Sequence, residues 1–126
     1  DGDIDAEDLR LITPDDVFQV FKKHYWDRYQ ADFIHNQSVA NLCVDWLWMS
    51  GAPAIRRVQQ LLQITVDGIV GPQTVASINL ANQRQLFEAI KTDRVRFVEE
   101  ICTRNPSQQV FRKGWMNRIN DFKFQS

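Results

Sequence analysis

Apolar residues recur every three or four positions along most of this chain, which is the spacing of one face of an α-helix. Residues that begin or end helices, such as Pro14, Gly51 and Asn82, divide this pattern into six stretches. We therefore predict helices over about 14–30, 36–50, 53–62, 72–80, 82–104 and 106–122. No stretch has the alternation of a β-strand, so the predicted fold class is all-α, a compact helical bundle.

One turn separates the predicted third and fourth helices, with the sequence Asp67-Gly-Ile-Val-Gly-Pro-Gln-Thr74. Gly68 predicts a positive φ angle, which only glycine adopts without strain, and Gly71-Pro72 sets a sharp entry into the next helix. The turn is interpreted either as a simple helix–loop–helix corner or as a segment that contacts a ligand. Apolar residues alternate through it, and we expect all of them to fill the gap between the helices: Ile64, Val66, Ile69 and Val70.

Length and composition narrow the picture. A chain of 126 residues with 44% hydrophobic and 25% charged residues is one ordinary globular domain. Its net charge of −1 argues against a protein that binds nucleic acid by neutralising phosphates. No stretch approaches the roughly 18 uninterrupted apolar residues of a membrane span. Cys43 and Cys102 lie in apolar helical stretches, so we expect buried free thiols, with a disulfide as the alternative.

The chain begins with an acidic stretch, Asp1-Gly-Asp-Ile-Asp-Ala-Glu-Asp-Leu9, that resembles the second half of a calcium-binding loop. In that register the metal ligands would come from Asp1, Asp3, Asp5 and Asp8. The first two ligand positions of such a loop would lie upstream of Asp1. A solvated acidic terminus is therefore the alternative for this chain, and we expect calcium only in an intact protein. No other cofactor is expected.

A central motif and four neighbouring motifs carry a resemblance to known proteins. The stretch from Val58 to Ile78 resembles the core of peptidoglycan-binding modules, in which a Leu-rich helix precedes Asp-Gly-x-x-Gly-x-x-Thr and another helix. Together with its neighbours it resembles, over nearly the whole chain, the N-acetylmuramidase or secretion-activator family of phage endolysins, glycoside hydrolase family 108. The neighbouring motifs are Lys23-His-Tyr-Trp-Asp-Arg-Tyr29, Asn36-Gln-Ser-Val-Ala-Asn41, Val44-Asp-Trp-Leu-Trp48 and Phe111-Arg-Lys-Gly-Trp-Met-Asn-Arg-Ile119.

The resemblance implies a lysozyme-like fold and cleavage of the β-1,4 bond of peptidoglycan glycan strands. Residues 1–51 would be the remainder of the muramidase domain, and residues 52–126 a peptidoglycan-binding-like region packed with it as one unit. The chain would supply scaffold and substrate cleft, as a monomer acting at the bacterial cell wall, in the periplasm or outside the cell. A non-catalytic peptidoglycan-binding module is the alternative.

The sequence departs from the family at the catalytic residue. Family members carry their catalytic glutamate in a Glu-Gly-Gly context, whereas none of the glutamates here precedes a glycine. We therefore assign no catalytic residue in this chain and expect the missing segment to precede Asp1. With neither an initiating Met nor a signal peptide, the chain is expected to be an internal fragment or a processed product. Asp45 is the candidate for the second carboxylate of such a site.

One helix face combines residue types that suit a sugar cleft. At 100° per residue, Ser38, Asn41, Asp45 and Trp48 share a face, opposite Val39, Leu42, Cys43, Trp46 and Leu47. Amide, hydroxyl and carboxylate groups fix sugar hydroxyls, and an indole stacks on a ring. With Gln37 and Trp26 these residues are the predicted substrate-binding set. The alternative is a solvated face with Asp45 paired to a surface Arg or Lys.

Other aromatic residues have two interpretations. Tyr25, Trp26 and Tyr29 form a cluster that either packs in the core or stacks on substrate. Trp115 is expected to be a packing anchor, with the preceding Gly114 permitting close approach of another helix.

Glycosidic cleavage needs a carboxylic acid that protonates the leaving oxygen, and such a group contributes roughly 100- to 10,000-fold to the rate. We therefore predict that this polypeptide alone lyses bacterial walls very slowly or not at all. A turbidity assay on purified walls, with an intact family member as the positive control, measures this. Lysis at the rate of the intact enzyme would contradict the prediction.

Overall fold

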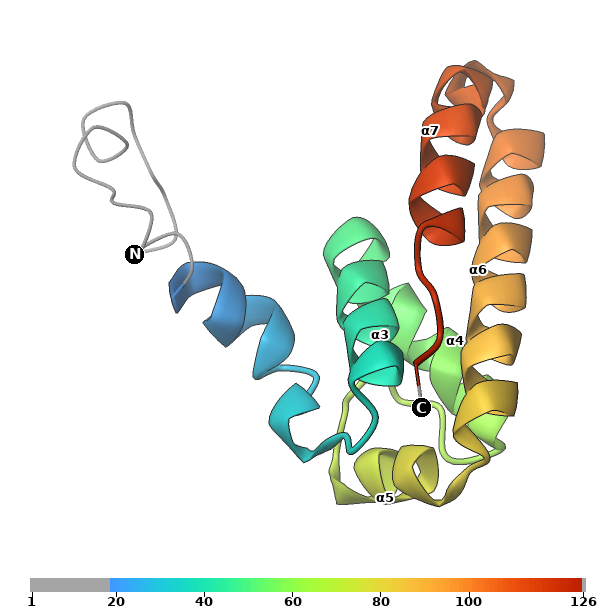
Figure 1. Ribbon diagram of the computed structural model, residues 1–126. Coiled ribbons are helices and arrows are strands. Elements are labelled where there is room, and N and C mark those ends of the chain that lie inside the picture. The colour runs from blue at the N-terminus through green and yellow to red at the C-terminus, as the bar shows by residue number, and fades with distance from the viewer. Residues whose placement is uncertain (1–18, 126) are drawn as a thin grey trace, which may run out of the picture.

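A computed structural model describes residues 19–125 of the chain, and its regular elements within this range are helices (Figure 1). The predicted all-α class is confirmed. The short elements are η1 (Lys22–Trp26, a π-helical turn), η2 (Ala31–Phe33) and η3 (Pro106–Gln108), both 3₁₀ helices. The α-helices are α3 (Gln37–Ser50), α4 (Ala52–Leu62), α5 (Pro72–Leu80), α6 (Gln83–Arg104) and α7 (Gln109–Asn120).

The long helix α6 organises the bundle. It contacts α3, α4 and α5, and α7 folds back along it as the second arm of a hairpin (Figure 1). None of the helices in the described part of the chain is long and apolar enough to span a bilayer.

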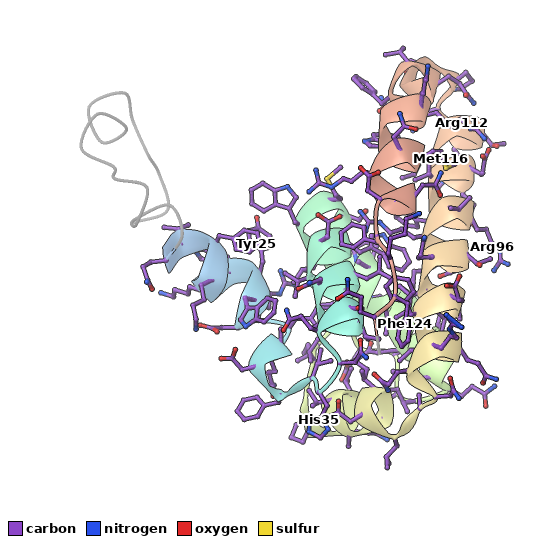
Figure 2. All side chains as sticks on the ribbon, in the orientation of Figure 1. Tyr25, His35, Arg96, Arg112, Met116 and Phe124 are labelled. Atoms are coloured by element: carbon purple, nitrogen blue, oxygen red, sulfur yellow. The ribbon has the colours of Figure 1, made fainter. Side chains whose placement is uncertain are left out.

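The segment 121–125 after α7 runs back between α3 and α6 (Figures 1 and 2). Its Phe124 ring packs 5.5 Å from the ring of Phe87 on α6. The backbone N–H of Gln125 donates to the Ser38 hydroxyl on α3 at 2.8 Å. This segment therefore joins the two helices from which the candidate sites below are built.

Most predicted helix ends lie where the sequence places them, for identifiable reasons. The side chain of Asn36 accepts a hydrogen bond from the Val39 N–H at 3.1 Å, which caps α3. Asn82 caps α6 in the same way. Gly51, at φ 71°, ends α3. Gln63 ends α4 at φ 59°, a left-handed residue that the sequence did not indicate.

The first predicted helix, 14–30, is wrong in its second half. Residues 14–18 lie outside the described range, and the helix that runs through residue 21 continues as the π-turn η1. The Asp27 N–H donates to the Lys22 carbonyl, five residues back, at 2.7 Å. The extra residue rotates the following side chains by about 100°, and Tyr29 is completely buried.

The apolar face predicted for α3 is confirmed as the centre of the core. All five of its members are buried, whereas Asn41 and Trp48 on the opposite face are exposed. Both cysteines are buried and free, as expected. Burial raises the pKa of the Cys43 thiol to about 12, so this thiol stays protonated at neutral pH. By contrast, Gly114 is exposed and a Cβ there would meet no atom within 4 Å, so its predicted role in helix packing is wrong.

The turn 67–74 is held by one buried amide, that of Gln59 on α4. Its Nε2 donates to the Asp67 carboxylate and the Ile69 carbonyl, both at 2.9 Å, and to the Thr74 hydroxyl at 3.3 Å. Its Oε1 accepts from the backbone N–H groups of Asp67 and Gly68 at 3.1 and 3.0 Å. The Gln59 side chain is 1% exposed, so every polar atom of this amide is satisfied inside the protein.

The backbone of the turn behaves as predicted at Gly68, whose φ is 74°. The expectation that all four apolar residues of the turn fill the gap between helices is only partly correct. Val70 is buried, but Val66 and Ile69 are 42% and 68% exposed. The Gln59 amide occupies the space inside the turn, so these two side chains point outward.

We predict that Gln59→Glu lowers the free energy of unfolding by about 3 kcal/mol at pH 7. A carboxylate cannot donate to the Ile69 carbonyl, and it would face the Asp67 carboxylate. Its pKa would be raised in the folded state, so the stability difference from wild type should shrink as the pH falls and the new group gains a proton. Denaturant unfolding at several pH values measures this. Gln60→Glu, at an exposed position of the same helix, is the matched control, and an equal loss in both variants would refute the role given to Gln59.

Candidate functional site

The structure places the six predicted substrate-binding residues in three neighbouring regions along α3. Gln37, Ser38 and Asn41 line a polar groove at its N-terminal half. Asp45, one turn further, belongs to an ion cluster with α6 and α7. Trp48, near the end of α3, contacts the segment around η1, and Trp26 is the last residue of η1 itself.

We call the first region the α3 groove. It lies between the start of α3 and the C-terminal segment, has a volume of about 580 Å³, and includes His35, Asp121 and Lys123 in its lining. Its groups are amides, a hydroxyl, an imidazole, a carboxylate and an ammonium. Such a mixture of donors and acceptors suits a ligand with many hydroxyl groups.

Part of the groove is already committed to holding the C-terminal segment. The Asn36 amide donates to the Gln125 carbonyl at 3.1 Å, and the Ser38 hydroxyl accepts the Gln125 N–H. Gln37 and Asn41 instead bond to each other, Nε2 to Oδ1 at 2.7 Å, and both are exposed. Gln37 and Asn41 are therefore the members of the predicted set best placed to bond a ligand.

The ion cluster centres on the Asp45 carboxylate, which joins α3 to both α6 and α7. The Nη2 of Arg94 donates to its Oδ2 at 2.6 Å, and the Nε of Arg118 lies 3.1 Å from both oxygens. Asp45 and Arg94 are mostly buried, with side-chain exposures of 14% and 4%. The structure thus pairs Asp45 with the surface residue Arg118, as in the alternative interpretation, and also with the buried Arg94, so Asp45 does not lie on a solvated face.

The arginines decide the charge of Asp45. Burial alone would raise its pKa, but hydrogen bonds from Arg118 and Arg94 hold the pKa of the carboxyl below its ordinary value. Asp45 is therefore ionised at neutral pH and cannot donate a proton to a leaving group. An electrostatic role as a second carboxylate stays a prediction.

The third region contains stacked aromatic side chains. The Trp48 ring lies 4.8 Å from the Tyr25 ring and 5.5 Å from the Phe21 ring, so the end of α3 contacts η1 and the residue before it. Trp48 remains 49% exposed, so one side of its indole is available for stacking. Trp26 lies apart from this stack, and its indole N–H donates to the Asp32 carboxylate at 2.7 Å.

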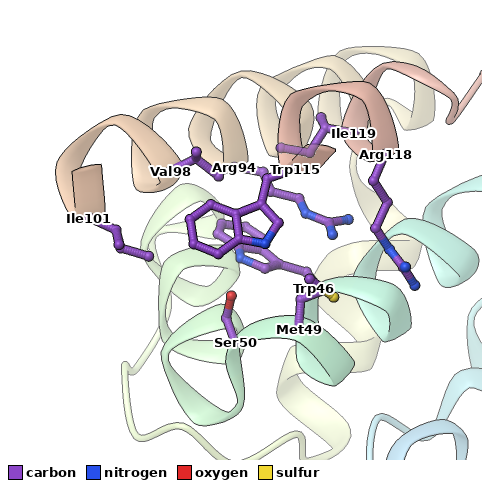
Figure 3. A pocket seen from close by; sticks show the side chains of 9 residues that line it. All are labelled: Trp46, Met49, Ser50, Arg94, Val98, Ile101, Trp115, Arg118 and Ile119. Atoms are coloured by element: carbon purple, nitrogen blue, oxygen red, sulfur yellow. The ribbon is translucent and has the colours of Figure 1, made fainter. Parts of the chain in front are cut away.

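A smaller cavity lies between α3, α6 and α7, and sequence reasoning did not find it (Figure 3). Trp46, Arg94 and Trp115 contribute to its lining. We call it the α3–α6–α7 cavity. One signal for it was present in the sequence, because Arg94 interrupts the apolar stripe of α6 four residues after Ile90 and four before Val98. A charged residue on a buried face is the informative exception in an amphipathic helix.

The predicted calcium ligands Asp1, Asp3, Asp5 and Asp8 lie outside the described residues. Between residues 19 and 125, no group of three or more His, Cys, Asp or Glu side chains is arranged to hold a metal ion.

The fold has a solved counterpart. The chain superposes on the structure of SagA from Brucella abortus with a TM-score of 0.79 at 19% sequence identity. The match covers 93% of this chain and 65% of the SagA chain, so this chain spans about two-thirds of that protein's length. The expected lysozyme-like helical class is thereby confirmed. No curated protein matches the chain in sequence.

Two family models match consecutive parts of the chain. The model for a predicted peptidoglycan domain matches residues 53–120, and the model for glycosyl hydrolase 108 matches residues 1–51. Because the first match alone covers more than half of the chain, the chain belongs to the predicted peptidoglycan domain family. The resemblance read from its motifs is confirmed by both matches.

The ion cluster predicts a stability effect. Asp45→Asn leaves the buried Arg94 without its counter-charge, and we expect it to lower the free energy of unfolding by about 3 kcal/mol at pH 7. The folded-state pKa of Asp45 is lowered, so its contribution is present above the unfolded pKa and is lost as the pH falls below about 4.

The free energies of unfolding of Asp45→Asn and wild type should therefore become more similar in acid. Denaturant unfolding from pH 7 to pH 3 measures this. Glu99→Gln breaks an exposed ion pair with Arg112 and serves as the control, with a much smaller effect. A pH-independent difference would rule out the ion cluster as its cause.

Proposed function

We propose that this chain forms the scaffold and part of the substrate cleft of a peptidoglycan-hydrolysing N-acetylmuramidase, which cleaves the β-1,4 bond of glycan strands. The observation that carries the proposal is the succession of two matches along one helical fold. Residues 1–51 match glycosyl hydrolase 108 and residues 53–120 match a predicted peptidoglycan domain. On this proposal residues 1–51 are the remainder of the muramidase domain, and residues 52–126 form a wall-binding-like region packed with it as one unit.

The exposed side of α3 supports the proposal. Gln37 and Asn41 offer amide groups at its start, and Trp48 offers a half-exposed indole near its end. Eleven residues separate Gln37 from Trp48, which corresponds to about 16 Å along the helix axis. A strand of several sugar units could contact the amides through hydroxyl groups and the indole through a ring face.

A non-catalytic peptidoglycan-binding module is the second candidate. Two carboxyl groups with lowered pKa values, which are ionised at neutral pH, favour this candidate. Asp45 is held ionised by two arginines, and the pKa of Asp67 is lowered by the Ile69 N–H and by Gln59. A general acid must carry a proton, so neither ionised carboxylate suits that role. Both are compatible with a protein that only binds.

In either role we propose that the protein acts at the bacterial cell wall, in the periplasm or outside the cell, as a monomer with glycan strands as its partner.

The groove can be tested with a peptide-free tetrasaccharide of the glycan strand in a calorimetric titration. We predict that the double variant Gln37→Ala/Asn41→Ala binds about tenfold more weakly, because two hydrogen bonds to sugar hydroxyls are lost. Gln60→Ala, an exposed glutamine on α4, should bind as wild type does. Equal affinity of all three proteins would exclude the α3 groove as the binding site.

A lysis assay separates the two candidates when this chain is joined at its N-terminus to a family member's segment that carries the catalytic glutamate, because this chain alone is predicted not to lyse walls. Lysis by the joined protein supports a scaffold role in catalysis, whereas wall binding without lysis supports the module.

A further inference from the structure

The α3–α6–α7 cavity has a buried floor and an accessible rim (Figure 3). On the floor, Trp46 and Arg94 are 1% and 3% exposed. At the rim, Met49 is 38% exposed and the Arg118 side chain 46% exposed. In Figure 3 the Trp115 indole lies at the centre of the group, with both arginines to one side of it. A small group can therefore enter from solvent and approach the floor, whose polar atoms are themselves covered.

Two donors on the floor have no hydrogen-bond partner among residues 19–125: the Nη1 of Arg94 and the Nε1 of Trp46. Buried donors without acceptors are rare in folded proteins, and a water, an ion or a ligand can complete them. Guanidinium and indole N–H groups donate only, so the missing partner must be an acceptor.

The local charge indicates which acceptor fits. Both oxygens of Asp45 already accept hydrogen bonds from Arg94 and Arg118. Two guanidinium groups and one carboxylate leave an excess of one positive charge beside the cavity. Burial, together with the neighbouring charge of Arg118, lowers the pKa of Arg94 despite its bond to Asp45. A second carboxylate would balance the cluster, and a neutral carbonyl would not.

Other acidic residues of α6 are engaged or lie elsewhere. Asp93 and Glu100 both pair with Arg57, Glu99 pairs with Arg112, and Glu88 is exposed and outside the cavity lining. Within the described residues, the acidic side chains of this helix therefore do not supply the second carboxylate.

The size of the cavity limits the ligand. Its volume is about 100 Å³, whereas a cavity of about 150 Å³ is known to hold benzene. A carboxylate with one small substituent fits, and a sugar ring does not.

The distance to the α3 groove also suits a peptide. Asn41 in the groove and Met49 at the rim of the cavity lie eight residues apart on α3, about 12 Å along the helix axis and about 80° apart around it. An extended peptide covers about 3.3–3.6 Å per residue, so four residues span that separation.

We propose that the α3–α6–α7 cavity binds the carboxylate of a short peptide, with Arg94 Nη1 and Trp46 Nε1 as donors and Arg118 as an added counter-charge. Peptidoglycan carries short peptides with free carboxylates along its glycan. Resting on the function proposed above, we assign the ligand to this stem peptide. The glycan would lie in the α3 groove while the peptide reaches the cavity.

The test follows the indole N–H resonance of Trp46 in ¹H–¹⁵N NMR spectra, which reports directly on the floor of the cavity. The probes are a disaccharide–tetrapeptide from peptidoglycan, the same disaccharide without peptide and with its lactyl carboxyl group converted to an amide, N-acetyl-alanine and N-acetyl-alanine amide. We expect saturable shifts of this resonance with the disaccharide–tetrapeptide and with N-acetyl-alanine, and no shift with the two probes that lack a carboxylate.

Two variants test the contacts. Arg94→Lys keeps a cation beside Asp45 but removes the free Nη1 donor, and we expect at least tenfold weaker binding of N-acetyl-alanine. Val98→Phe fills the cavity from α6 and should bind N-acetyl-alanine as weakly as Arg94→Lys does. Val95→Phe, on the same helix and outside the cavity lining, is the matched control and should bind as wild type does. Circular dichroism spectra check that each variant is folded.

The outcomes distinguish this inference from the proposed function. Binding of the disaccharide–tetrapeptide without any shift at Trp46, or equal shifts with N-acetyl-alanine and its amide, would overturn the carboxylate site and leave wall binding intact. Shifts with N-acetyl-alanine but no binding of either disaccharide would support the site and count against peptidoglycan as its source.

Discussion

The arrangement of the bundle depends on a charge that three helices share. The Asp45 carboxylate of α3 is bonded by Arg94 of α6 and Arg118 of α7. Because Arg94 is buried, this carboxylate cannot be removed without leaving a cation in the core. The same contact fixes how far apart the three helices lie, and hence the shape of the cavity between them. Asp45, which was predicted to lie on the substrate face of α3, therefore has a structural role.

The helical framework could be predicted from the sequence because local signals and packing agree. Asn36, Gly51 and Asn82 act as caps, and the apolar face of α3 is the buried face. The prediction failed where a non-local demand overrides the local pattern. The π-turn after Phe21 accommodates the burial of Tyr29, which helical periodicity alone cannot reveal.

The candidate site was predicted less completely, for a similar reason. Spacing on one helix identified a polar and aromatic stripe of Ser38, Asn41, Asp45 and Trp48. The structure has Asn41 exposed beside a groove and Trp48 half-exposed near η1. The spacing could not identify Arg118 or the segment 121–125, because both lie more than seventy residues along the chain from the α3 residues that they contact. Periodicity reports which face a residue occupies, but not which distant element covers it.

The buried amide of Gln59 bears on how this turn should be recognised in other sequences. The letters Asp-Gly-x-x-Gly-x-x-Thr specify the backbone of the loop, but the group that closes it lies eight residues earlier, on the preceding helix. A chain that has the loop motif and an apolar residue in place of Gln59 would match the pattern but lack the amide that holds the turn. The informative signature is therefore longer than the turn itself: it begins at the glutamine, and the spacing between glutamine and aspartate is part of it.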